Sequence, residues 1–307
     1  QKDFGNRDPK SSFLTEIAST IGVLEHAIKN VDKWTKDEKR PSNVDRPFFI
    51  RMLMGLLGSK SYIKYQPLGT VGVISPWNFP VNLILAPLGG IFAAGNRAMI
   101  KPSELTPATS EVTKKMFEAY FDKSEAAVFT GDAEVGAAFS ALPFDHLLFT
   151  GGTQIGKKVM KAASDNLVPV TLELGGKSPV IVDEEANLSE VAKKVMRGKT
   201  MNAGQICLAP DYLMLPKGKS EEFAKASNEA VSEMFADLKY NEDYTSVINE
   251  RHYERINELV SDAKEKGAEV IQINPADEDF EQQELHKIPP TLVLNPTDEM
   301  KIMQEEI

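Results

Sequence analysis

Between residues 65 and 174 the chain alternates short apolar runs with longer segments whose apolar residues recur at helical spacing. The short runs have the length of strands in a buried sheet, and the longer segments have the length of helices. We expect strands at 71–75, 98–101, 127–130, 146–150 and 168–174, and helices at 83–94, 106–121, 133–140 and 154–164. Strands that alternate with helices favour a parallel sheet covered on both faces, and right-handed crossovers make it a doubly wound, Rossmann-like α/β fold. In such sheets ligands bind outside the carboxyl ends of the strands.

The segments on either side of this alternation have different patterns. Residues 14–30 predict an amphipathic helix, residues 35–47 a charged loop, and residues 59–66 an extended segment. After Gly175 and Gly176 a second series begins. We expect its strands at 180–182 and 291–294, and its helices at 188–200, 221–238 and 250–266. We therefore place a domain boundary near residues 174–176, between a domain of residues 1–174 and a second α/β domain of residues 175–307.

Residues 65–96 carry no charged side chain, and a run of that length can suggest a membrane span. Prolines and asparagines interrupt the run at Pro67, Pro76, Asn78, Pro80, Asn82 and Pro87. A broken backbone exposed to lipid is not tolerated. We therefore expect this run to form a buried strand, an uncharged loop and a core helix.

The composition narrows the classes of partner and compartment. The 307 residues include 35 Lys and Arg against 45 Asp and Glu, which gives a formal charge of −10 and a pI near 5.1. This acidity argues against nucleic acid and against an anionic membrane surface as partners. The single cysteine excludes an intramolecular disulfide and a cysteine-based metal cluster within one chain. We expect a reducing, cytoplasmic compartment and no metal cofactor.

Cys207, in MNAGQICLAP, follows an expected helix and a glycine, so we place it on a turn. A free cysteine is commonly a buried small apolar residue, and that alternative stays open. A nucleophilic thiol needs an activating environment and a base, because the pKa of an ordinary cysteine is about 8.5. The candidate base is Glu173, a carboxylate expected to be partly buried at the end of an apolar strand. The alternatives for Glu173 are a helix N-cap or an ion pair with Lys177.

Two further candidate segments follow expected strands. Asn78, in SPWNFPVN, stands between two aromatic residues and two prolines. It could mark a rigid turn with aromatic packing, or it could donate its side-chain amide to a developing oxyanion. Lys101 ends an expected strand, and Glu104 opens the next helix. Glu104 could hold a ribose hydroxyl, or it could belong to an ordinary helix entry that Ser103 caps.

The segment FTGGTQIGKK, residues 149–158, combines a strand, a glycine turn and a helix start, so its backbone amides could face a phosphate. It nearly matches a P-loop, with Gly151, Gly156 and Lys157 at the right spacing. Lys158 stands where that motif needs a hydroxyl for magnesium, so we reject a P-loop. His252 is expected on a solvated, charged helix face, although a Cys207–His252 hydrolase pair is a further alternative.

Together these segments resemble the NAD(P)-dependent aldehyde dehydrogenase superfamily. The resemblance rests on an ordered series that spans most of the chain: PLGTVGVISPWNFP, AAGNRAMIKPSELTP, HLLFTGGTQIG, TLELGGKSP, NAGQICLAPDY and MQEEI. Chance agreement of so many segments in order is negligible. The sequences around them, such as FGNR, SALPFDHLLFTG, NEDYTSVI and PPTLVL, look like the coniferyl-aldehyde dehydrogenase branch.

The resemblance implies oxidation of an aldehyde to the carboxylic acid, with hydride transfer to NAD(P). Cys207 matches the nucleophile of the family, which forms a thiohemiacetal with the aldehyde and, after hydride transfer, a thioester. Asn78 and the backbone N–H of Cys207 match the oxyanion hole. Glu173 matches the base that activates water for hydrolysis of the thioester.

The resemblance also implies which residues contact the cofactor. Lys101 and Glu104 match the contacts to the adenosine ribose, and Glu306 matches the acid that holds the nicotinamide ribose. The other expected cofactor contacts are Ser75, Trp77, Gly131, Gly151, Gly152 and Ile155. We expect NAD as the cofactor, with NADP also usable. The carboxylate of Glu104 would repel a 2′-phosphate, and Lys101 would partly offset that repulsion.

By the same resemblance, residues 1–174 form the cofactor-binding domain, with part of an oligomerisation segment near 59–66. Residues 175–307 form an α/β catalytic domain that is incomplete at its C-terminus. The sequence ends at Ile307, where the family continues, and an N-terminal helical segment is missing, so we expect a chain truncated at both ends. FTGG has Gly152 where FTGS is commoner in the family. The full-length protein is expected to act on an aromatic or other hydrophobic small-molecule aldehyde, as a homodimer or homotetramer.

Two alternatives to this function remain. The first is a cofactor-independent thiol esterase or hydrolase that uses Cys207 with Glu173 or His252, since thioester chemistry makes such an activity reasonable. The second is an inactive fragment or a non-catalytic binding protein, because a fold can lose its activity. The joint presence of Cys207, Glu173, Asn78 and Lys101 argues against the second alternative.

Overall fold

The computed structural model describes residues 2–42, 45–281 and 283–307. Its central sheet is parallel, with the strand order β5-β4-β3-β6-β7. The strands are β3 (Thr70–Ile74), β4 (Arg97–Lys101), β5 (Ala126–Val128), β6 (His146–Gly151) and β7 (Val170–Leu174). The chain starts in the middle of the sheet at β3, builds outward to β5, and then returns to add β6 and β7 on the other side. This is the order of a doubly wound sheet, so the predicted Rossmann-like fold is confirmed.

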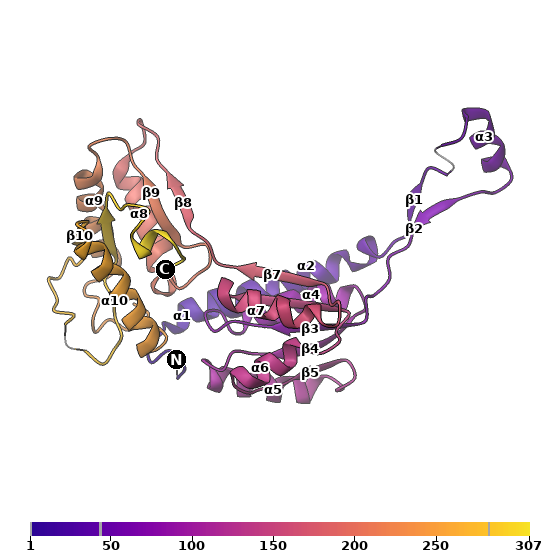
Figure 1. Cartoon of the computed structure of the whole chain (residues 1–307), viewed down its shortest axis with the longest axis horizontal. Coiled ribbons are helices and arrows are strands. Elements are labelled where there is room, and N and C mark those ends of the chain that lie inside the picture. The colour runs from indigo at the N-terminus through magenta and orange to yellow at the C-terminus, as the bar shows by residue number, and fades with distance from the viewer. Residues whose placement is uncertain (1, 43–44, 282) are drawn as a thin grey trace.

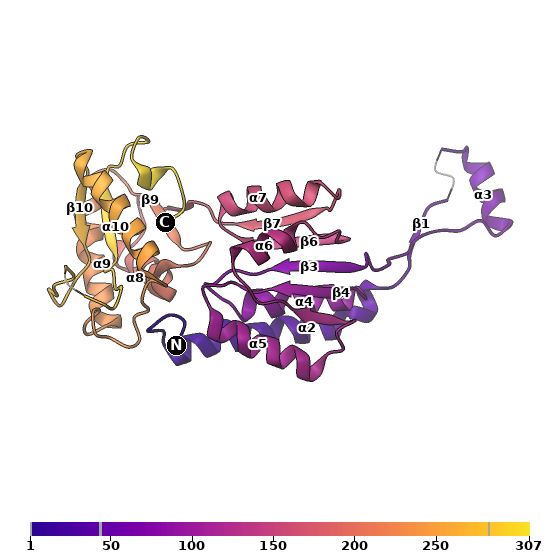
Figure 2. The same cartoon turned by 60° about the horizontal axis from the view of Figure 1, so that its bottom comes forward.

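Helices cover both faces of this sheet. They are α4 (Asn82–Ala93), α5 (Pro107–Tyr120), α6 (Ala133–Ser140) and α7 (Thr153–Ser164). Helices α4 and α5 bury Ile84, Leu88 and Phe117 against one face, and α6 and α7 bury Phe139 and Val159 against the other (Figure 2). Strands that are buried on both faces need apolar residues throughout, which explains their continuous apolar runs.

The uncharged run at residues 65–96 contains β3, a loop and α4, as the sequence predicted. No helix among the described residues combines the length and the apolar character that crossing a membrane requires. The predicted strand ends are shifted by a residue or two at several places. For example, β5 ends at Val128 rather than at residue 130, and β7 begins at Val170 rather than at residue 168.

A second unit follows Leu174, where the chain leaves the parallel sheet. Its strands form two separate pairs, a parallel pair β8 (Ser178–Ile181) with β9 (Pro210–Met214) and an antiparallel pair β10 (Glu269–Gln272) with β11 (Thr291–Leu294). Its helices are α8 (Leu188–Thr200), α9 (Ser220–Met234) and α10 (Glu250–Glu265), with short 3-10 turns at Met201–Gly204 and Lys301–Met303. The unit lies beyond the carboxyl ends of β3 and β4 (Figure 2). The sequence analysis did not predict β9 or β10, and α9 ends before the expected residue 238.

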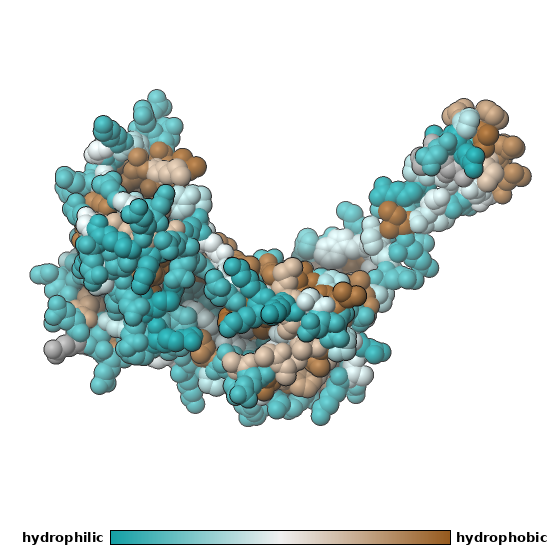
Figure 3. Space-filling view, viewed as in Figure 1, coloured by the Kyte–Doolittle hydropathy of each residue, from teal (hydrophilic) through white to brown (hydrophobic). Residues whose placement is uncertain are grey.

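The N-terminal part of the chain adds a helical layer and a projecting arm. A continuous helical stretch, α1 (Pro9–Ser12), a π-helical turn (Phe13–Ala18) and α2 (Ser19–Trp34), lies along α4. The hairpin of β1 (Glu38–Arg40) and β2 (Ser61–Ile63) then carries α3 (Phe48–Leu56) away from both units (Figure 1). Apolar side chains gather at the tip of this arm (Figure 3).

The arm agrees only in part with the sequence analysis. Strand β2 lies within the extended segment predicted at 59–66. Strand β1 lies within the loop predicted at 35–47, of which residues 43 and 44 fall outside the described residues. Helix α3 was not predicted.

Candidate functional site

A groove of about 1270 Å³ lies where the carboxyl ends of the parallel strands face the second unit. Doubly wound sheets bind ligands at this end, where the strand order reverses between β3 and β6. Predicted site residues that line the groove are Trp77, Asn78, Gly151, Gly152, Ile155, Glu173, Cys207 and Glu306. Those outside its lining are Ser75, Lys101, Glu104 and Gly131. The tertiary structure therefore brings the three predicted catalytic residues into one cavity, although they come from three separate segments.

Cys207 is carried into the groove by a left-handed turn that follows α8. Asn202, Ala203 and Gly204 have φ values of 50°, 51° and 77°, and only glycine adopts this region without strain. The turn reverses the chain immediately before Gln205, so that the thiol of Cys207 is exposed in the groove. The alternative of a buried apolar cysteine is therefore wrong.

The surroundings of Cys207 disfavour its thiolate. Desolvation raises the pKa of the Cys207 thiol, and the negative charges of Glu306 and Glu173 raise that pKa further. Backbone N–H groups of Cys207 and Leu208 oppose these effects only in part. The thiol is therefore protonated at neutral pH, and a reaction that uses it as a nucleophile requires removal of its proton.

Asn78 lies in the loop between β3 and α4, directly against the Cys207 turn. Its side-chain Nδ2 donates to the backbone carbonyl of Gln205 at 3.1 Å. Asn202, which sequence reasoning did not single out, donates from its own Nδ2 to the carbonyls of Asn78 at 3.4 Å and Gln205 at 3.2 Å. These bonds tie the amide of Asn78 to the segment that carries Cys207, which is the place an oxyanion donor must occupy.

Glu173 lies in β7, beside Thr150 of β6. Its side chain is exposed to the groove, whereas the sequence predicted a partly buried carboxylate. Lys177 donates to Asp211 at 2.6 Å instead of pairing with Glu173, so the ion-pair alternative is wrong. Among the described residues nothing donates a hydrogen bond to this carboxylate, which leaves it able to accept a proton from water or substrate.

Lys101 and Glu104 form an ion pair at the carboxyl end of β4. Lys101 is 2% exposed, and its Nζ donates to Oε2 of Glu104 at 2.8 Å. The Glu104 side chain is 44% exposed. Burial alone would raise the pKa of Glu104, but the hydrogen bond and the charge of Lys101 outweigh burial and lower that pKa. The Glu104 carboxylate is therefore ionised and can accept hydrogen bonds at the carboxyl end of β4.

Ser75 and Gly131 lie near this pair and not in the groove. The backbone N–H of Ser75 donates to the carbonyl of Lys101, and its side chain is buried. A Cβ atom on Gly131 would collide with the side chain of Val135, so glycine is needed for that close approach. Ser75 is therefore held directly against Lys101, and Gly131 allows the close approach of Val135 at the start of α6.

The glycine turn after β6 begins α7 at the edge of the groove. Gly152 is the N-cap residue of α7, and no side chain caps this helix end. A Cβ atom on Gly152 would meet nothing within 4 Å, so the space above the first turn is open. N–H groups at the start of a helix attract anions, and these are accessible to a ligand in the groove.

His252, on α10, lines the groove, a position that the sequence did not predict. Its ring lies 5.3 Å from the ring of Trp77, centroid to centroid, and its side chain is half-buried rather than solvated. Burial, followed by the charges of Arg251 and Arg255, lowers the pKa of His252 to about 4. His252 is therefore neutral at pH 7. No local pattern could have revealed this contact, because Trp77 and His252 come from different units.

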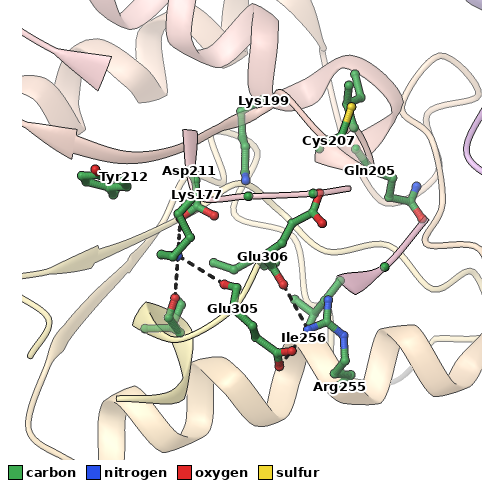
Figure 4. A pocket seen from close by; sticks show the side chains of 18 of the residues that line it. Lys177, Lys199, Gln205, Cys207, Asp211, Tyr212, Arg255, Ile256, Glu305 and Glu306 are labelled. Carbon is green, nitrogen blue, oxygen red and sulfur yellow. Dashed lines mark hydrogen bonds and ion pairs between the residues drawn. The ribbon is translucent and has the colours of Figure 1, made fainter. Parts of the chain in front are cut away.

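A cluster of charged side chains forms the wall opposite Cys207 (Figure 4). Arg255 donates to the Glu305 carboxylate and to the backbone carbonyl of Glu306, both at 3.3 Å. Lys177 donates to Asp211 and to the carbonyl of Ile302. These bonds hold the 302–306 segment across the groove. The Glu306 carboxylate in this segment lies against Gly175.

Comparison with known proteins agrees with this geometry. The aldehyde dehydrogenase family matches residues 5–307. A probable coniferyl aldehyde dehydrogenase of Caulobacter vibrioides is 57% identical over 306 residues, which are 100% of this chain and 62% of that protein. A coniferyl aldehyde dehydrogenase of Pseudomonas sp. strain HR199 is 50% identical over 305 residues, which are 99% of this chain and 61% of that protein. The chain thus spans less than two thirds of the length of these relatives.

Solved structures give the same result for the fold. A substrate-bound AldH of Staphylococcus aureus has a TM-score of 0.85 and 38% identity, covering 98% of this chain and 62% of its own. An aldehyde dehydrogenase of Mycobacterium tuberculosis, complexed with NAD+, has a TM-score of 0.83 and 25% identity, covering 99% of this chain and 60% of its own. From the groove, its residues and these similarities, we conclude that the chain belongs to the aldehyde dehydrogenase family.

Proposed function

We propose that the full-length protein oxidises an aldehyde to the carboxylic acid, with NAD as the preferred hydride acceptor and NADP as a poorer one. The observation that carries the proposal is the convergence of Cys207, Asn78 and Glu173 on one groove at the carboxyl ends of the parallel strands. The names of the coniferyl aldehyde dehydrogenase relatives support an aromatic or other hydrophobic aldehyde as the substrate.

In the first stage Cys207 acts as the nucleophile. Its thiol gives up its proton to a water molecule in the groove, and the sulfur attacks the carbonyl carbon, which forms a thiohemiacetal. The developing negative charge on the carbonyl oxygen is stabilised by the Asn78 amide and the backbone N–H of Cys207. When bound, NAD supplies the hydride acceptor that the oxidation requires, and a thioester on Cys207 is left.

In the second stage Glu173 acts as the general base. Its exposed carboxylate removes a proton from a water molecule, and the resulting hydroxide attacks the thioester carbon. The carbon–sulfur bond breaks, the carboxylic acid leaves, and the sulfur takes a proton back to restore the thiol. This assignment separates the two stages, because Glu173 is needed for hydrolysis of the thioester and not for its formation.

The groove and the adjoining strand ends fit a dinucleotide. The uncapped start of α7 and the open space above Gly152 suit a pyrophosphate. The Lys101–Glu104 pair, with Ser75 and Gly131 beside it, suits an adenosine ribose, since an ionised carboxylate accepts hydrogen bonds from ribose hydroxyls. The remaining proposed contacts along the groove are Trp77, Gly151, Ile155 and Glu306.

The domain roles follow from the same argument. We assign cofactor binding to residues 1–174 and the catalytic domain to residues 175–307, with the groove between them. We also propose a homodimer or homotetramer for the full-length protein, to which the arm around residues 59–66 contributes. The exposed apolar residues of α3, including Phe48, Phe49 and Leu56, support an interface at this arm.

The experiment that tests the function is a nicotinamide-absorbance assay of the full-length protein with coniferyl aldehyde and other aldehydes. Wild type should produce NADH only when both aldehyde and NAD are present. Cys207→Ala should reduce the rate to below about a tenth of wild type, a barrier increase of more than about 1.4 kcal/mol. Cofactor binding, followed by quenching of tryptophan fluorescence, should be retained in this variant.

Two outcomes would contradict the proposal. Oxidation by Cys207→Ala at more than about a tenth of the wild-type rate would contradict the assignment of Cys207 as the nucleophile. Hydrolysis of an ester by wild type at full rate without NAD, together with no NADH from any aldehyde, would support the alternative of a thiol hydrolase.

A further inference from the structure

The segment before α1 contacts both units of the molecule. The carboxylate of Asp3 accepts hydrogen bonds from the backbone N–H groups of Ala108 and Thr109 at the start of α5. The side chain of Asn6 donates to the carbonyls of Asn241 and Tyr244 in the second unit. The segment is therefore fixed at two points, one on each unit, and the residue that follows Asn6 is fixed with it.

Arg7 is buried under the loop that carries Asn78. It is 4% exposed, and its Nη1 donates to Oε1 of Glu16 at 3.0 Å and to the backbone carbonyl of Asn78 at 3.0 Å. Its guanidinium also lies against two aromatic rings, with Cζ 4.8 Å from the centroid of Phe4 and 5.1 Å from that of Phe79. Stacking on both rings restricts the plane of the guanidinium, and so restricts the direction of the bond to Asn78.

Glu16, the partner of Arg7, holds the other end of the same loop. It is 5% exposed, and its Oε2 accepts from the backbone N–H of Val81 at 3.0 Å and of Asn82 at 2.8 Å. These are the first N–H groups of α4, where a carboxylate is favourable. One buried ion pair thus fixes both the carbonyl of Asn78 and the helix that follows it.

A buried ion pair is a costly way to obtain stability alone. Removing two charges from water has a desolvation free energy that their attraction offsets only in part. Apolar residues of similar volume often stabilise a fold as well or better. The pair does, however, offer directed hydrogen bonds that apolar packing cannot supply. The backbone carbonyl it holds belongs to the residue proposed to donate to the oxyanion.

We propose that Arg7 and Glu16 are positioning residues that hold the side-chain amide of Asn78 in place beside Cys207. The inference rests on the proposed function, in which Asn78 stabilises the oxyanion. The bond from Arg7 fixes the Asn78 backbone, while the bond from Asn78 Nδ2 to the Gln205 carbonyl shows how near the amide lies to the Cys207 turn. An oxyanion donor acts only within a narrow range of distance, so a small displacement of the loop weakens it strongly.

The test measures the burst of NADH in the full-length enzyme, which reports formation of the thioester. Arg7→Gln removes the charge that fixes the loop, and we expect the burst rate to fall by about 10- to 10²-fold, the loss that a misplacement of about 1 Å produces. Lys193→Gln is the control. Lys193 pairs with Glu233 at 2.9 Å on the surface of the second unit, where both side chains are exposed, and its loss should leave the burst unchanged.

A double-mutant cycle distinguishes positioning from general destabilisation. Asn78→Ala alone should slow the burst by about 10²–10³-fold. Adding Arg7→Gln to Asn78→Ala should slow it by no more than about twofold further, because Arg7 acts through the amide that is already absent. A merely structural role predicts instead that the two losses multiply.

The other possible results for the Arg7 and Asn78 variants also test whether Arg7 positions Asn78. Multiplying losses, or a normal burst in Arg7→Gln while Asn78→Ala is slow, would overturn the inference and leave the proposed function intact. A normal burst in Asn78→Ala would overturn the inference and the oxyanion role of Asn78, while the burst itself would still report oxidation of the aldehyde. If Arg7→Gln does not fold, Arg7→Lys replaces it. Lysine keeps the buried charge and can pair with Glu16, but it lacks the fixed guanidinium plane, so we expect normal thermal stability, a slowed burst and the same non-additivity with Asn78→Ala.

Discussion

The carboxylate of Glu306 occupies the space that a β-carbon on Gly175 would need. Gly175 follows β7 by one residue, and Glu306 lies in the C-terminal segment that Arg255 and Lys177 hold across the groove. The side chain of residue 175 must therefore be absent for Glu306 to reach this position. Glycine is required at position 175 because of a contact with a residue far away in the sequence, and not because of its own backbone conformation.

Gly175→Ala should displace the Glu306 carboxylate without unfolding the protein. The collision is with the end of a flexible side chain, so the free energy of unfolding should change by less than about 0.5 kcal/mol. Loss of the hydrogen bond that we propose between Glu306 and the nicotinamide ribose should reduce NAD-dependent turnover by about tenfold. Gly176→Ala is the control, because a β-carbon there meets nothing within 4 Å. Equal activity of the two variants would show that the position of Glu306 is unimportant.

The reactivity of Cys207 should depend on Glu306. Desolvation and the negative charge of Glu306 raise the pKa of this thiol, so its thiolate fraction at neutral pH is small and grows as pH rises. Glu306→Gln removes that charge, which lowers the pKa and should speed alkylation by iodoacetamide at pH 7. Cys207 is the only cysteine of these 307 residues, and mass spectrometry of the labelled peptide that contains it measures its rate directly. Glu305→Gln should have little effect, and a slower reaction in Glu306→Gln would reverse the assigned sign.

Glu173→Gln should separate the two chemical stages. The amide cannot take a proton from water, so hydrolysis of the thioester should slow by about 10²–10⁴-fold. Formation of the thioester should be spared, and stopped-flow absorbance should show a burst of NADH followed by slow turnover. If burst and steady state fell by the same factor, Glu173 would have a different role.

Glu104 should set the preference for NAD over NADP. Its ionised carboxylate would face a 2′-phosphate that carries about −1.5 to −2 charges, and Lys101 offsets this repulsion only in part. Glu104→Gln should therefore narrow the difference in kcat/KM between the two cofactors. Glu111→Gln is the control, since Glu111 also pairs with a lysine, Lys115, but on an exposed helix face. An unchanged ratio in Glu104→Gln would mean that the carboxylate does not set the preference.

The elements whose structure is decided by local pattern were predicted correctly from the sequence. The strands around Val73, Ile100 and Leu147 were predicted because both faces of the parallel sheet are covered, which makes each strand a continuous apolar run. The polar residues after these strands were identified as candidates for the same reason. They interrupt the apolar pattern at the end of a parallel sheet where ligands bind.

Strands and helices that pair weakly with the core escaped prediction. Strand β10 is only partly buried, and β9 begins with a proline, so neither strand gives a clear strand pattern in the sequence. Helix α3 exposes Phe48, Phe49 and Leu56 on the arm, and its apolar residues have no partner within the described residues that could give them a single face. The hydrophobic pattern of a segment depends on which of its side chains are buried, and burial at these segments comes from neighbours that are distant in the sequence.

The sequence by itself determined the alternation of strands and helices and the kinds of side chain at the strand ends, because both follow from periodicity over a few residues. Only the tertiary structure decided which of those side chains meet. It joined Asn78 to the Cys207 turn, exposed Glu173 to the groove and paired Lys177 with Asp211. It also buried Arg7 and Glu16 beneath the Asn78 loop and brought His252 against Trp77. These contacts join segments far apart along the chain, and they form only when folding removes water from between them.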